Sequence, residues 1–123
     1  MNNQAIIIGR IVNDLEIKEE NDRKELVLLV ATPREYKNED GIYETDFIDC
    51  YLYDTIAEQV KEYCKKGDTV GIRGRLRSSN VELENERTIK LIKVIVEKIS
   101  FLSSKKDSVD EDNNTDRAKN EEE

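Results

Sequence analysis

Two short stretches of the sequence place aromatic and basic side chains at alternating positions, the spacing of one face of a β-strand. In residues 46–53, one face carries Phe47, Asp49, Tyr51 and Tyr53, and the other carries Ile48, Cys50 and Leu52. In residues 69–77, one face carries Arg73, Arg75 and Arg77, and the other carries Val70, Ile72 and Leu76. Aromatic rings stack on bases of any type, and guanidinium groups neutralise phosphates. The two faces therefore predict a surface for single-stranded nucleic acid.

A purely structural interpretation of the same residues stays open. The rings of Phe47 and Tyr53 could pack under a loop or a partner chain. The three arginines could form a solvated face that pairs with the carboxylates of Glu82, Glu84 and Glu86. The alternating pattern alone does not choose between these interpretations.

Most catalytic chemistry is excluded by composition. The 123 residues include no histidine, which removes Ser-His-Asp and Cys-His catalysis and every histidine-containing zinc site. The two cysteines, Cys50 and Cys64, cannot form a four-ligand metal cage, and each falls on an apolar face, so we expect small core residues. The carboxylates lack ligand spacing. We predict no enzyme activity, no metal and no cofactor.

Charge is distributed unevenly along the chain, whose net charge is −8. Residues 107–123 hold eight acidic and two basic residues but only one apolar residue of any size, Val109. Such a segment cannot bury enough apolar surface to order itself, which predicts a disordered acidic tail. Residues 1–106 then form the single domain. With neither a signal segment nor an apolar run long enough to span a membrane, we expect a cytoplasmic protein.

Short β-branched runs within the domain predict five strands and one helix. The expected strands are Gln4 to Val12, Glu25 to Thr32 stopped by Pro33, Asp46 to Tyr53, Thr69 to Arg77, and Thr88 to Phe101. The helix follows the third strand. Thr55 and Glu58 are spaced as an N-terminal capping box, Gly67 is expected to cap the C-terminus, and Ile56, Val60, Tyr63 and Cys64 repeat at helical spacing.

This order predicts an all-β protein with one short helix, namely a five-stranded OB-fold, a Greek-key β-barrel whose helix closes the bottom. The first two expected strands are apolar on both faces. In the first, Ile6 and Ile8 lie on one face and Ile7 and Ile11 on the other; in the second, one face carries Leu26, Leu28 and Val30, and the other carries Val27 and Leu29. A small barrel needs only one apolar face. The excess predicts a second buried surface, most simply a subunit interface.

Several blocks of the chain, in order and nearly collinear up to Leu102, resemble the bacterial single-stranded DNA-binding protein family. The blocks are Met1-Asn2-Asn3 with Gly9-Arg10, Asp46-Phe47-Ile48-Asp49-Cys50, Ala57-Glu58, Tyr63-Cys64-Lys65-Lys66-Gly67, and Val70-Gly71-Ile72-Arg73-Gly74-Arg75-Leu76. The resemblance implies a homotetramer of OB-folds. Such tetramers bind and protect single-stranded DNA during replication, recombination and repair.

The resemblance also implies the site residues. The family's stacking positions match Tyr36, Phe47 and Tyr53, while a fourth falls on Val81, which has no ring. We expect phosphates to be neutralised by Arg73, Arg75 and Arg77, helped by Arg10, Arg34 and Lys37. The family typically ends in an apolar tip that docks on replication and repair proteins, and this sequence ends Glu121-Glu122-Glu123 without one.

Two other functions stay open. One is an OB-fold assembly or protein-interaction subunit with weak or lost DNA binding, which the missing ring at Val81 and the −2 net charge of residues 1–106 favour. The other is an RNA-binding OB domain, which would depend on the 2′-hydroxyl group.

Overall fold

The computed structural model describes residues 1–104. Six strands and one helix follow one another along the chain. They are β1 (Ala5–Ile11), β2 (Lys18–Glu20), β3 (Arg23–Lys37), β4 (Tyr43–Tyr53), α1 (Asp54–Tyr63), β5 (Thr69–Glu82) and β6 (Thr88–Ser103). The predicted acidic tail, residues 107–123, lies outside the described residues.

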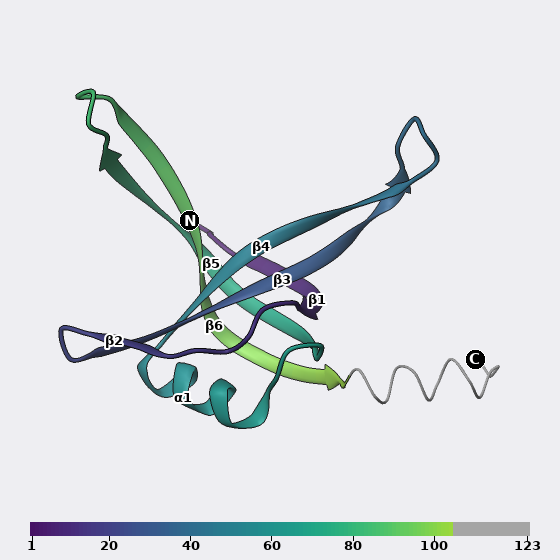
Figure 1. The fold of residues 1–123 in the computed structure, drawn as a ribbon, viewed down its shortest axis with the longest axis horizontal. Coiled ribbons are helices and arrows are strands. Elements are labelled where there is room, and N and C mark those ends of the chain that lie inside the picture. The colour runs from purple at the N-terminus through teal and green to yellow at the C-terminus, as the bar shows by residue number, and fades with distance from the viewer. Residues whose placement is uncertain (105–123) are drawn as a thin grey trace.

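The strands form one sheet that returns to its own start. Its order is β1-β5-β6-β4-β3-β2, and β1 also pairs with β3, so that the five long strands form a closed ring of pairings. All neighbours are antiparallel except β4 and β6, which meet in parallel at Cys50 and Tyr51. This arrangement agrees with the predicted OB-fold, with the short strand β2 added at the edge of β3 (Figure 1).

The interior of the ring holds the apolar residues of alternating strand positions. Fully buried side chains on four of the strands are Ile11, Leu26, Leu28, Val30, Cys50, Leu52 and Val70. Helix α1 adds Ala57 and Val60 to this cluster and packs against β3 and β4. The prediction that Cys50 and Leu52 share the apolar face of their strand is therefore confirmed.

The helix lies where the sequence predicts it, but its ends differ. Its N-cap is Tyr53, and no side chain caps it, so the predicted Thr55–Glu58 capping box is wrong. The Glu58 carboxylate instead accepts a hydrogen bond from Lys24 Nζ on β3, at 2.8 Å. The helix ends at Tyr63 with Cys64 as its C-cap, so Gly67 is not the cap but lies in the following turn, with φ of 99°. Tyr63 is exposed rather than on the buried face.

Strand β3 continues past the residue that was expected to stop it. Pro33 lies inside the strand and pairs with Thr45 of β4. Pairing of β3 with β1 involves Val30 and Ala31, so no strand on that side requires an N–H group from Pro33. The three-residue strand β2 was not predicted because it is fully exposed and has no apolar residue.

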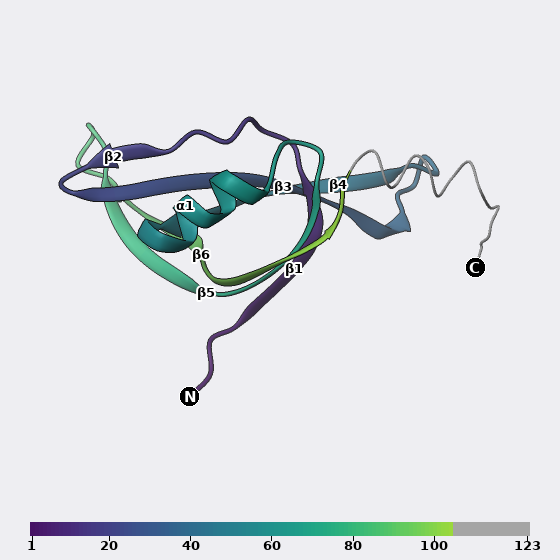
Figure 2. The ribbon, with the colours of Figure 1, turned by 90° about the horizontal axis from the view of Figure 1, so that it is seen from below.

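Two long hairpins extend beyond the ring. Residues 33–47 of β3 and β4 form the β3–β4 arm, and residues 77–93 of β5 and β6 form the β5–β6 arm. Figure 1 shows the two arms diverging on the side of the molecule away from α1, and Figure 2 shows them at opposite ends of the ring. Most side chains in both arms are exposed, so the arms add surface rather than core.

A close approach of two strands marks the base of the β5–β6 arm. Arg73 pairs with Lys98 and Gly74 with Val96, which leaves Glu97 of β6 as the extra residue of a bulge. A Cβ atom on Gly74 would lie 2.1 Å from the carbonyl oxygen of Ile95. Only glycine fits at this position of β5.

Candidate nucleic-acid interface

Two of the predicted stacking residues lie on the β3–β4 arm with their rings in solvent. Tyr36 is 82% exposed and Phe47 is 61% exposed. Phe47 lies opposite Ala31 in the register, at the base of the arm, and its side chain points away from the interior cluster that contains Cys50 and Leu52. Covering this exposed ring with a ligand would be favourable, because it would remove apolar surface from water.

The third predicted ring, Tyr53, lies at the opposite end of β4, where α1 begins. The ring is half-buried, and the guanidinium of Arg23 lies over it, 4.0 Å from the ring centroid. Arg23 Nε also lies 3.8 Å from Asp54 Oδ2. Burial raises the pKa of the Tyr53 hydroxyl, as do the charge of Glu25 and a hydrogen bond to it. Tyr53 is therefore part of a second local cluster, separate from the arm.

The arginine row, defined as Arg73, Arg75 and Arg77, is exposed along the outer face of β5. The row begins within the ring and reaches the base of the β5–β6 arm. Arg75 Nε lies 3.7 Å from Glu97 Oε2, while no ion pair is found for Arg73 or Arg77 within residues 1–104. Since surface ion pairs contribute little, Arg75 remains available to a phosphate.

Strand β6 connects the arginine row to the rings of β4. In the register, Ile95 pairs with Tyr51 on one side and with Arg75 on the other. Ile95 is buried but lies outside the interior cluster, as expected for a side chain on the outer face. The Lys93 ammonium lies 4.5 Å from the centroid of the Tyr51 ring. The Tyr51 ring, Lys93 and the arginine row thus lie on one outer surface across three strands.

Tyr51 and Lys93 are absent from the sequence-predicted site residues. The alternation of residues 47–53 already places Tyr51 on the aromatic face, so a signal for it existed. No local signal exists for Lys93, because its approach to Tyr51 depends on the parallel contact between β4 and β6.

The other predicted cations have different surroundings. Arg34 donates to Asp46 through Nε at 3.2 Å and through Nη2 at 2.9 Å, and to Glu44 through Nη1 at 3.2 Å. The hydrogen bond from Arg34, together with its positive charge, lowers the pKa of the Asp46 carboxyl. Lys37 lies over the Tyr43 ring, 5.6 Å from its centroid. Both cations therefore brace the β3–β4 arm.

Arg10 is not brought together with the arginine row. It is exposed on β1, pairs with Thr69 at the start of β5, and borders a small cleft with Lys66 and Gly67. Val81, at the family's fourth stacking position, is half-buried on the β5–β6 arm opposite Ile89.

The remaining chemistry of the described residues is limited. Cys50 and Cys64 are free thiols, and burial raises the pKa of Cys50 to about 12. Within residues 1–104, no three carboxylate or thiol groups are placed to hold a metal ion. In the same residues, no helix has the length and apolar character needed to cross a membrane.

Comparison with known proteins gives a consistent result. The model of the single-strand binding protein family matches residues 2–102. A single-stranded DNA-binding protein of Staphylococcus epidermidis is 35% identical over 105 residues, covering 85% of this chain and 79% of the relative. One from Lactiplantibacillus plantarum is 32% identical over 109 residues, covering 88% of this chain but only 54% of the relative.

A solved structure shares the fold. The complex of a Plasmodium falciparum SSB with single-stranded DNA matches with a TM-score of 0.71, at 23% identity, covering 84% of this chain and 96% of that chain. At this level of identity the likeness concerns the fold. It supports the OB-fold topology predicted from the order of strands and helix.

Proposed function

Because the chain belongs to the single-strand binding protein family, we propose that it binds and protects single-stranded DNA without strong sequence preference and has no catalytic activity. The observation that carries this proposal is the outer surface on which the Tyr51–Lys93 pair borders the arginine row, with the exposed Phe47 ring further along the same face of β4. Rings accept any base, and cations accept any phosphate, so the surface is suited to a strand of any sequence.

The stacking residues in this proposal are Tyr36, Phe47 and Tyr53. Arg73, Arg75 and Arg77 neutralise phosphates, with Arg10, Arg34 and Lys37 in supporting positions. The partial neutralisation of Arg34 by Asp46 and Glu44 supports only a modest contribution from that residue. The cellular role is protection of single strands during replication, recombination and repair in the cytoplasm.

We also propose that the protein acts as a homotetramer. The supporting observation is an apolar patch on the outer face of β1, where Ile6 is 70% and Ile8 is 62% exposed. A Cβ atom built on Gly71 would lie 3.7 Å from Leu102 and 4.0 Å from Ile8, so these residues form one contiguous surface. Light scattering of the native protein and of Ile8→Glu tests it. We expect a tetramer for the native protein and a smaller species for Ile8→Glu. A monomeric native protein would overturn the proposal.

The experiment for DNA binding is a fluorescence-anisotropy titration of labelled oligo-dT at several salt concentrations. We expect log K to fall linearly with log salt, by about 0.7 for each phosphate neutralised on a single strand. A duplex of equal length is the control, and equal affinity for it would refute the proposal. An oligo-rU strand tests for RNA binding, because tighter binding to it would reveal recognition of the 2′-hydroxyl.

The second candidate is an OB-fold assembly subunit with weak or lost DNA binding. The observation in its favour is that carboxylates engage Arg34 and Arg75, two of the expected phosphate contacts. This candidate predicts no salt-dependent binding of oligo-dT at any ionic strength, while the higher oligomer persists.

A further inference from the structure

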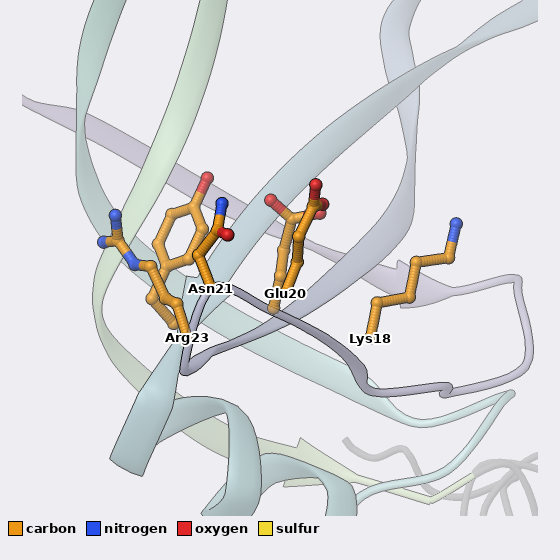
Figure 3. Close-up of a pocket in the computed structure, with 6 residues that line it drawn as sticks. Lys18, Glu20, Asn21 and Arg23 are labelled. Atoms are coloured by element: carbon orange, nitrogen blue, oxygen red, sulfur yellow. The ribbon is translucent and has the colours of Figure 1, made fainter.

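A cleft beside Tyr53 is not explained by the arm or by the arginine row. The β2–β3 hairpin and the end of β4 enclose a volume of ≈ 420 Å³. Its lining residues are Lys18, Glu20, Asn21, Arg23, Glu25 and Tyr53. Figure 3 shows the side chains of Lys18, Glu20, Asn21 and Arg23 projecting from the hairpin to the same side.

The strand register explains why these side chains share one face. Lys18 pairs with Glu25 across β2 and β3, and Glu25 pairs with Tyr53 across β3 and β4. Glu20 pairs with Arg23 one step nearer the hairpin turn. Because directly paired residues in antiparallel strands point to the same side of the sheet, the five side chains line one surface.

The hairpin that carries the cleft has a defined shape. Asn21 and Asp22 form its two-residue turn, with φ of 53° and 61°. Two positive φ values in a two-residue loop are typical of the type I′ turn, whose twist matches that of the flanking strands. The backbone that carries the cleft residues is therefore fixed before any ligand binds, which reduces the entropic cost of binding.

The charges of the cleft do not favour a phosphate. Lys18 and Arg23 supply two cations, while Glu20 and Glu25 supply two carboxylates. Arg23 is also 3.8 Å from Asp54. No surplus positive charge remains, in contrast to the arginine row. A ligand that offers both hydrogen-bond donors and acceptors suits this mixture better than an anion does.

We propose that this cleft binds a guanine base of the single strand, an inference that rests on the proposed function. Guanine offers adjacent N1–H and N2–H donors, which a carboxylate accepts together, and O6 and N7 acceptors for Lys or Arg. Thymine has one ring donor between two carbonyl groups. Adenine and cytosine each place an amino group beside a bare ring nitrogen that repels a carboxylate.

The contacts that the cleft residues already make determine which part of the guanine base each of them can bind. Glu25 is half-buried and lies opposite Tyr53 in the register, whereas Glu20 is exposed at the hairpin, so Glu20 is the acceptor for the two guanine donors. Arg23 lies over Tyr53 at 4.0 Å, and a guanidinium plane can stack on a base as well as on a ring. Guanine would extend the Tyr53–Arg23 stack by one layer, in a cleft that Lys18 and Asn21 also line.

The test uses a labelled oligo-dT of about 16 nucleotides, the upper end of the site size of one OB fold, with a single dG moved along the strand. We expect dG to tighten binding about fivefold or more at one position, the lower bound for a good bidentate base contact. Deoxyinosine at that position lacks the N2 amino group and should lose most of the gain. Single dA and dC substitutions should give none.

Two matched variants assign the effect to the cleft. Glu20 is exposed, and its side chain forms no ion pair or hydrogen bond within residues 1–104. Glu20→Gln should therefore fold normally, as circular dichroism will check, and should abolish the preference for dG. Glu19→Gln is the control, because Glu19 lies on the same strand but faces Lys24 instead. It should retain the preference.

Each outcome has a definite meaning. Binding of oligo-dT with no position that prefers dG would overturn the guanine site and leave the proposed function standing. A preference that survives Glu20→Gln would also overturn it. Failure of the native protein to bind oligo-dT would refute the proposed function, and this inference with it.

Discussion

Replacement of Phe47 by alanine separates binding from stability. The ring is 61% exposed and lies outside the interior cluster, so its removal should change the free energy of unfolding by no more than about 0.5 kcal/mol. For a domain of this size, that corresponds to a shift in Tm of at most about 4 °C. Loss of a base-stacking ring costs about 1–3 kcal/mol of binding free energy, or roughly a 5- to 150-fold loss of affinity.

The assay measures affinity for oligo-dT by anisotropy and Tm by circular dichroism on the same samples. The chain supplies a matched control in Phe101, its other phenylalanine, which is 52% exposed beside α1. Phe101→Ala should bind as the native protein does, and Phe47→Trp should retain or improve affinity. A Phe47→Ala protein that binds normally but melts at a much lower temperature would refute the assignment of Phe47 to the binding face.

Four further predictions follow from the structure and the sequence. Asp46→Asn combined with Glu44→Gln should release Arg34 for a phosphate and steepen the salt dependence of log K by about 0.7, measured in the same titration; an unchanged slope would show that Arg34 does not reach the strand. Gly74→Ala should lower Tm strongly, because its Cβ would meet the Ile95 carbonyl oxygen at 2.1 Å; a normal melting curve would contradict the close approach. Cys50, whose pKa burial raises to about 12, stays a neutral thiol at pH 8 and should react with a disulfide reagent only in denaturant; rapid reaction in the native state would exclude its burial. Deletion of residues 107–123, with eight acidic and two basic residues, should tighten DNA binding at low salt, and the difference should disappear near 0.15 M, where the Debye length is about 8 Å; weaker binding after truncation would refute this competition.

The sequence predicted those features that depend on alternation within one strand. The faces of residues 46–53 and the exposure of Ile6 and Ile8 follow from a period of two, and the structure agrees with both. Pro33 misled the prediction because a missing N–H matters only where a neighbouring strand needs it. The predicted capping box failed because Asp54, with φ of 55°, starts the helix one residue before Thr55.

The contacts that complete the site were beyond sequence reasoning because they join distant strands. Lys93 reaches Tyr51 through the parallel contact of β6 with β4, and Arg23 covers Tyr53 through the pairing of β3 with β4. Alternation predicts the side of a strand on which each residue lies. It contains no information about which strand is the neighbour, and that neighbour determines the partner of every exposed ring.

The two arms extend far beyond the interior that stabilises the ring. Their amide groups are held by cross-strand hydrogen bonds and surface pairs such as Arg34–Asp46, with little apolar burial behind them. Segments of this kind open locally without global unfolding. Amide hydrogen exchange should therefore be fast in the arms and slow in the ring, and a bound strand should slow it in the arms. Calorimetry measures the heat of cooperative unfolding, which comes mainly from the ring. It would therefore largely miss an increase in order within the arms.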